Sequence, residues 1–374
     1  MRTTSRVLAA SALALVALAA CGSDDDPAGA GTATSADDTE SVSSNPGSDV
    51  AVATAPPSDD SGEATTVDNQ GGKVELVAYS TPQEAYGAII EGFKDTPQGA
   101  GVDVTESYGG SGDQSRAVES GQPADYVGFS LEGDVTRLVK AGLVAEGWNT
   151  NEYEGIVTDS VVVLVVREGN PKGISGWEDL TKEGVEVVTP NPFTSGGARW
   201  NVMGAYGSQI EQGKSEEQAI QFLHDLFANV VVQDASARES LQTFAGGVGD
   251  VLIAYENEAI FAQQQAQDLE YIVPDQTILI ENPVSLTAAG QDNSAARAFY
   301  DYVFTAEAQQ IFLDNGYRPV NEEVAVDGSK FPTPTGLFTI ADFGGWSDVM
   351  AKFFNPDGSV MVEVERAIGV SIEQ

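Results

Sequence analysis

The chain has 374 residues, of which 57 are acidic and 18 basic, so its formal net charge at pH 7 is −39. A chain this acidic repels nucleic acid, and it can hold an anion only through local donors rather than through its overall field. With one cysteine, the chain can form no internal disulfide. Its one histidine, His224, lies in an amphipathic segment without a second histidine or a thiol in the folded part, so a place on a helix surface is favoured over zinc binding or Ser-His catalysis. We therefore expect no cofactor, no metal and no nucleic-acid partner.

The N-terminal residues predict an exported lipoprotein. Arg2 and Arg6 precede an apolar run over 7–20, which is typical of a secretory signal and too short to span a bilayer. The run ends in LAACG, which resembles a bacterial lipobox with Cys21 as the lipidated residue. We expect residues 1–21 to be a lipoprotein signal peptide and the mature chain to be lipid-anchored on the extracytoplasmic face of the cell membrane.

Residues 22–72 have the composition of a flexible tether. They include nine Asp, two Glu and no Lys or Arg, and they are otherwise rich in Ser, Thr, Ala, Gly and Pro. Such a segment cannot bury enough apolar surface to offset the loss of chain entropy, so we expect it to be disordered. A flexible chain of this length has an end-to-end distance of roughly 40 Å.

From residue 73 onward, strand-like and helix-like segments alternate. We expect strands at Lys73–Tyr79, Val102–Glu106, Tyr126–Phe129, Val161–Val166, Gly184–Val188, Val230–Val232 and Val251–Ala254. We expect helices after Ser80, at Asp113–Ser120, Ala198–Tyr206, Glu216–Asn229 and Arg238–Ala245, and a helix pair at Ala295–Asn315. This alternation predicts an α/β fold with mainly parallel sheets flanked by helices.

Four loops between a strand and a helix share one chemistry. Each loop carries small or hydroxylic residues; the loops are Ser80 with Thr81, Gly109–Ser111, Ser195–Gly197 and Ser236–Arg238. Helix starts present unpaired backbone amides and the positive end of the helix dipole, and ligands of open α/β sheets lie at the carboxyl ends of the strands. The four loops together predict an oxyanion site.

Longer motifs resemble one family over about Val74 to Phe354. They are YGGSGDQ from Tyr108, NPKGISGWEDL from Asn170, TPNPFTSGGARWN from Thr189 and GDVLIAYENEA from Gly249. The chain is similar to the sulfate-binding lipoproteins of ABC importers. The resemblance implies a two-lobed periplasmic-binding-protein-like fold of type II with the ligand cleft between the lobes. It implies a first lobe of residues 73–163 and 284–374 and a second lobe of residues 164–283.

The resemblance also implies a set of residues around the ligand. The implied donors are Ser111, the hydroxyl and amide of Ser195, and the amides of Gly196, Gly197 and Ala237, with Arg238 supporting the site from behind. Two positions depart from the family, which usually has an Asp where this chain has Ser80 and a Trp where it has Tyr255. A phenol can donate or accept a hydrogen bond, whereas an indole only donates, so both departures concern ligand discrimination.

The implied function is capture of sulfate outside the cytoplasm and its delivery to the permease of an ABC importer by a monomeric, non-enzymatic protein. Thiosulfate, molybdate and phosphate remain alternative ligands. An exported ester hydrolase is a further alternative, and the sequence offers it no convincing nucleophile, metal site or general base.

Overall fold

The computed structural model describes residues 71–370. The predicted signal peptide, Cys21 and nearly all of the predicted tether lie outside this range. The first strand begins at Gly72, one residue before the predicted start of the folded part. Within residues 71–370, no helix is long and apolar enough to cross a membrane.

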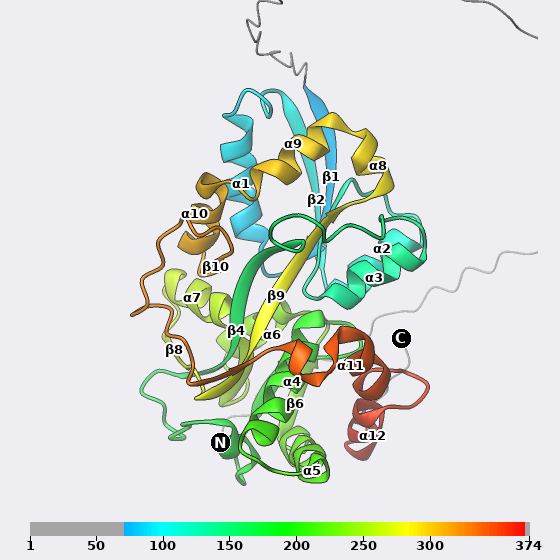
Figure 1. Cartoon of the computed structure of the whole chain (residues 1–374). Helices are drawn as coiled ribbons and strands as arrows, with labels where there is room; N and C mark the ends of the chain where they lie inside the picture. Colours follow the sequence, from blue (N-terminus) through cyan, green and yellow to red (C-terminus); the bar gives the residue numbers. More distant parts are fainter. Residues whose placement is uncertain (1–70, 371–374) are drawn as a thin grey trace, which may run out of the picture. The chain divides into compact units, whose positions relative to one another are not determined.

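The first lobe is built on three parallel strands (Figure 1). Its central strand β1 (Gly72–Tyr79) pairs with β2 (Val102–Gly109) on one side and β3 (Tyr126–Gly128) on the other. The helices of this lobe are α1 (Gln83–Lys94), α2 (Ser111–Glu119), α3 (Glu132–Lys140), α8 (Ala288–Asp292), α9 (Ser294–Tyr302) and α10 (Ala306–Asp314). Helix α1 buries Ala85, Tyr86, Ile89, Ile90 and Phe93, a stripe at helical spacing that faces the aromatic core of the lobe.

The second lobe repeats this plan. Its central strand β5 (Val187–Pro190) pairs in parallel with β6 (Val230–Asp234) and β7 (Val251–Tyr255). The other elements are η1 (Trp177–Thr181), α4 (Gly196–Glu211), α5 (Glu216–Phe227), α6 (Ala237–Ala245), α7 (Glu256–Gln264) and β8 (Leu269–Ile272). Helix α4 is buried on all sides from Gly196 to Gln209, so its sequence is not amphipathic.

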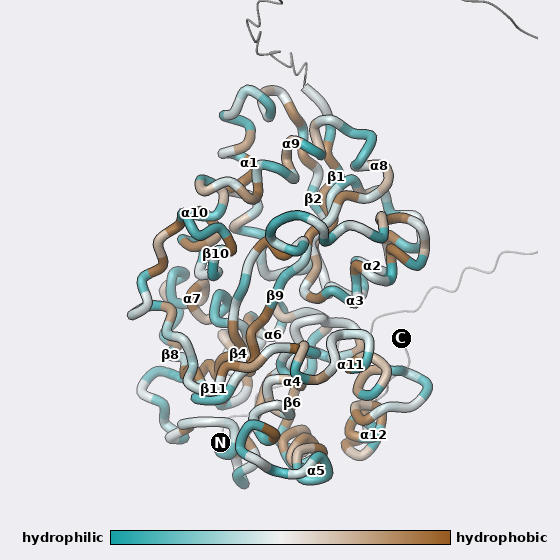
Figure 2. The backbone as a smooth tube through the Cα atoms, in the orientation of Figure 1, coloured by the Kyte–Doolittle hydropathy of each residue, from teal (hydrophilic) through white to brown (hydrophobic). Residues whose placement is uncertain are grey.

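Two long strands join the lobes. Strand β4 (Ile156–Arg167) and strand β9 (Gln276–Leu286) pair antiparallel with each other, and the strand order is β2-β1-β3-β9-β4-β7-β5-β6. Much of β4 and β9 is hydrophobic, as the brown parts of the tube show in Figure 2. The predicted α/β fold is confirmed, but the sheets are mixed rather than mainly parallel, because β9 pairs antiparallel with β3 and β4 pairs antiparallel with β7 and β8.

The C-terminal residues pass beside both long strands and end in helices. Strand β10 (Arg318–Pro319) pairs with β4, and β11 (Gly336–Phe338) pairs with β9. They are followed by η2 (Ile340–Phe343), α11 (Gly345–Phe353) and α12 (Val360–Ala367). Helix α12 packs against α5, and α11 contacts α3. The predicted lobe boundaries remain a prediction, but this packing places the last helices against both lobes rather than against the first alone.

Candidate anion-binding site

All eight ligand-site residues predicted from the sequence lie at strand ends or helix starts. Ser80 follows β1 and Tyr255 ends β7, whereas Ser111 opens α2, Ser195 precedes α4, Gly196 and Gly197 form the first turn of α4, and Ala237 and Arg238 open α6. The carboxyl ends of parallel strands and the starts of the following helices share one edge of each sheet, which explains how residues far apart in sequence meet.

The start of α4 supplies one hydroxyl and two amides. The Ser195 hydroxyl accepts a hydrogen bond from the Ala198 amide at 3.4 Å, which leaves its proton available for a ligand. The amides of Gly196 and Gly197 have no intrahelical acceptor, because they lie in the first turn. The Ser195 amide differs from the prediction, since it donates to the Asn191 carbonyl oxygen at 2.9 Å and is therefore engaged.

The start of α6 lies beside the start of α4. A Cβ built at Gly197 would lie 3.3 Å from the Ala237 Cβ and 3.4 Å from the Ser195 Oγ. Ser236 caps α6 in a capping box, so the Ala237 amide in the first turn has no intrahelical acceptor. On the first lobe, the Ser80 Oγ accepts from the Arg238 amide at 3.5 Å. This contact places Ser80 beside the start of α6.

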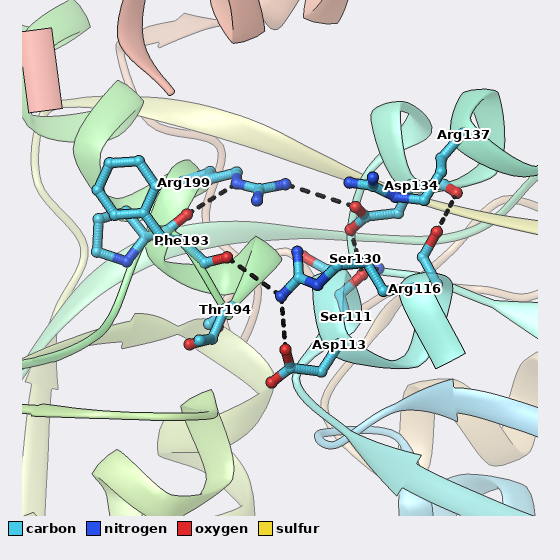
Figure 3. Close-up of polar contacts among 12 residues, drawn as sticks. Ser111, Asp113, Arg116, Ser130, Asp134, Arg137, Phe193, Thr194 and Arg199 are labelled. Carbon is cyan, nitrogen blue, oxygen red and sulfur yellow. Dashed lines mark hydrogen bonds and ion pairs between the residues drawn. The ribbon is translucent and has the colours of Figure 1, made fainter. Parts of the chain in front are cut away.

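The Ser111 hydroxyl belongs to a buried network rather than facing outward. Its Oγ donates to Asp134 Oδ2 at 2.6 Å and accepts from the Ser130 amide at 3.0 Å. Figure 3 shows Asp134 reaching on its other side toward Arg199, whose Nη1 lies 3.5 Å from Asp134 Oδ1. Because the Ser111 hydroxyl proton is already donated, the predicted role of Ser111 as a ligand donor could be filled only by its amide, at the start of α2.

A hydroxyl pair crosses between the lobes at this place. The Oγ of Ser130, which follows β3, lies 2.6 Å from the phenol oxygen of Tyr255. Tyr255 is 1% exposed, and burial raises the pKa of its phenol well above the usual value, so it keeps its proton at physiological pH. Sequence reasoning missed Ser130, although a hydroxyl just past the end of a strand is the feature that singled out Ser80.

The two arginines at the site are each paired with carboxylates. Arg238 donates to Glu258 through Nε and Nη2 at 3.0 and 2.8 Å and to Glu84 through Nη1 at 2.6 Å. Burial lowers the Arg238 pKa, but the two carboxylates outweigh it and the pKa is raised overall. Arg199 is 3% exposed beside the fully buried Asp134, and burial lowers its pKa. Both guanidinium groups thus have their charge balanced within the protein.

The lobes touch directly around the site. The Gly112 amide donates to the Thr194 carbonyl oxygen at 3.1 Å, and Arg116 Nη2 reaches the Phe193 carbonyl oxygen at 3.4 Å (Figure 3). The Trp200 indole donates to the Ser130 carbonyl oxygen at 2.7 Å. These bonds join α2 and the loop after β3 to the start of α4, so the arrangement is closed and the helix starts are sequestered between the lobes.

Comparisons with known proteins agree with this architecture. A family model described as "Bacterial extracellular solute-binding protein" matches residues 74–318. The chain is 45% identical to the "Sulfate-binding protein" of Synechococcus elongatus, over 79% of this chain and 87% of that protein. It is 34% identical to the "Thiosulfate-binding protein" of Escherichia coli, over 76% and 88%. Among solved structures, the sulfate-binding protein SubI from Mycobacterium tuberculosis H37Rv superposes with a TM-score of 0.73 at 43% identity, covering 76% of this chain and 100% of that one.

Proposed function

Because this chain belongs to the bacterial extracellular solute-binding proteins, we propose that it captures sulfate outside the cytoplasm and delivers it to the permease of an ABC-type importer. Relatives named for sulfate, at 36–45% identity, support sulfate over thiosulfate, whose named relatives are 32–34% identical. SubI, at 43% identity over its full length, supports the same ligand.

The observation that carries this proposal is that helix-start amides and hydroxyls from both lobes lie close together, while Arg199 and Arg238 are already paired with carboxylates. Each helix start carries about half a positive elementary charge and first-turn amides that lack acceptors. Sulfate is a dianion without a proton near neutral pH, so it can accept from every one of them. The proposed ligand groups are the amides of Ser111, Gly196, Gly197 and Ala237 and the hydroxyls of Ser80, Ser195 and Tyr255. Arg238 holds α6 against the first lobe from behind.

The same donor set opposes phosphate. Phosphate carries at least one proton near neutral pH, and that proton would face a donor and remain without an acceptor. An unmatched buried polar group costs about 1–3 kcal/mol, which supports discrimination against phosphate. The hydroxyls of Ser80 and Tyr255 are the groups that could turn to accept such a proton.

A binding role without catalysis fits the carboxylates beside the site. Glu256 accepts from Arg318 Nε at 2.8 Å, and Glu258 is held by Arg238. Both carboxylates are therefore occupied in ion pairs, which speaks against an ester hydrolase that would use either as a general base.

Anchoring and assembly complete the proposal. Cys21 would carry the lipid, and residues 22–72 would tether a monomeric binding domain to the extracytoplasmic face of the membrane. Such a tether lets the domain capture its ligand and dock onto the permease while it stays near the bilayer.

Titration calorimetry of the purified protein against sulfate, thiosulfate, molybdate and phosphate tests the proposal. We expect one-to-one binding, tightest for sulfate, and a rise in melting temperature with ligand because the ligand binds the native state. Absence of any thermal shift with millimolar sulfate, thiosulfate, molybdate or phosphate would refute anion capture. Phosphate binding as tight as sulfate would reassign the ligand.

A further inference from the structure

Ser130 is one of the most constrained residues around the site. Its amide donates to the Ser111 Oγ at 3.0 Å, and its carbonyl oxygen accepts from the Trp200 indole at 2.7 Å and from Asn282 Nδ2 at 3.1 Å. These partners come from α2, α4 and β9. The Ser130 backbone is therefore fixed from three directions, and its side chain has little freedom of position.

The side chain of Ser130 lies against the first turn of α4. A Cβ built at Gly196 would lie 2.7 Å from both the Cβ and the Oγ of Ser130. Only a glycine at position 196 therefore allows the Ser130 side chain to lie this close to the first turn of α4. The Tyr255 ring is also near this turn, because its Cε1 would lie 3.7 Å from a Cβ built at Gly197.

We propose that Ser130 is a positioning residue that holds the Tyr255 phenol toward the bound anion, and that the Ser130–Tyr255 hydroxyl pair forms only when the lobes close. Ser130 belongs to the first lobe and Tyr255 to the second, and their oxygens lie 2.6 Å apart. This inference rests on the proposed function and names a residue and a coupling that the ligand set above does not contain.

Either hydroxyl could be the donor of this bond, and the acidity of the two groups favours one direction. One hydroxyl donates to the other, and one proton remains for an outside acceptor. When Ser130 donates to the phenol oxygen, the Tyr255 proton turns to the anion, and the chain of two hydrogen bonds strengthens the one that reaches the charge. The phenol is the better terminal donor because it is the more acidic hydroxyl.

A hydrogen bond that exists only in the closed state slows dissociation of the ligand and leaves its association rate nearly unchanged. Removing either hydroxyl leaves its partner buried without its hydrogen bond, for which losses of about tenfold in affinity are typical. We expect this loss in the dissociation rate of sulfate, with an association rate within about twofold of the parent. The melting temperature without ligand should stay near that of the parent.

The test is a double-mutant cycle on the full chain with sulfate as the probe, using Ser130→Ala, Tyr255→Phe and the double variant. Tyr255→Phe should raise the dissociation rate about tenfold in the parent and less than about threefold in the Ser130→Ala background, because the two hydroxyls act as one unit. Ser285→Ala is the matched control, since Ser285 is also buried and its hydroxyl donates to the Leu286 carbonyl oxygen, away from the site. It should leave the rates unchanged.

The outcomes separate this inference from the proposed function. If the parent binds sulfate but the effects of the two substitutions are additive, the positioning role is overturned and sulfate capture stands. The same holds if Ser130→Ala has no effect on the sulfate rates. A fall in ligand-free melting temperature with unchanged sulfate rates shows a purely structural role and also overturns it. If the parent binds no sulfate, the proposed function and this inference fail together.

Discussion

Replacing Gly196 by alanine tests the closed arrangement most directly. The added Cβ would lie 2.7 Å from the Cβ and Oγ of Ser130 and 3.1 Å from the Ser111 Cβ. Separations below 3 Å require an atom to move, and Ser130 cannot move easily because three hydrogen bonds fix its backbone. Overpacking of this kind costs about 1–3 kcal/mol.

This cost should appear in binding rather than in folding. Gly196 belongs to the second lobe, whereas Ser111 and Ser130 belong to the first, so the overlap is relieved if the lobes separate slightly. The dissociation constant for sulfate should therefore rise about 5- to 150-fold. Without ligand, the melting temperature should not fall, since alanine favours a helix over glycine by about 1 kcal/mol.

Calorimetric titration and ligand-free thermal unfolding measure the two quantities. Gly87→Ala is the matched control, because it makes the same change inside α1 where a Cβ would meet nothing within 4 Å. It should leave sulfate affinity unchanged. Gly196→Ala binding sulfate within twofold of the parent would show that the lobes need not approach this closely, and the reasoning would fail.

Three further substitutions test separate parts of the molecule. Ser195→Ala should weaken sulfate binding by about 1–3 kcal/mol in calorimetry, and parent-like affinity would reduce this hydroxyl to a helix cap. Burial, with a smaller contribution from Glu281, raises the Asp159 pKa to about 7, so the folded state loses stability as pH rises from about 4 to 7. At pH 8, Asp159→Asn should then raise the free energy of unfolding above that of the parent by at most about 4 kcal/mol. At pH 4 it should give no such gain, and an equal gain at both pH values would exclude the Asp159 carboxyl as the cause. Cys21→Ser should release the protein from membranes in fractionation without changing sulfate affinity, whereas retained membrane association would point to another anchor.

Local chemistry in the sequence was enough to predict the helix starts that form the proposed site. Ser195 with two following glycines predicts the start of α4, and Ser236 with Glu239 forms the capping box that opens α6. Short-range rules of this kind operate within one turn, so they need no knowledge of the fold. The apolar runs that form β1, β4 and β7 likewise predict strands from local sequence alone.

Contacts between distant segments lay beyond such rules. Arg199 and Asp134 are 65 positions apart, and nothing near either residue indicates that it will be buried against the other. Ser130 meets Tyr255 across 125 positions for the same reason. The engagement of the Ser195 amide depends on the fold of the loop at Asn191, which sequence patterns alone did not define.

The charge pattern explains how an acidic protein can hold a dianion and still release it. Arg199 and Arg238 are each paired with a buried carboxylate, Asp134 and Glu258 respectively, so neither adds a free positive charge that would have to part from the ligand. In the proposed site, the stabilisation would come instead from amides and hydroxyls that meet only when the lobes close, and water that reaches them would weaken their hydrogen bonds to the anion. With this ligand set, affinity would be tied to closure of the lobes, and a permease that opens the lobes would need no further chemistry to free the anion.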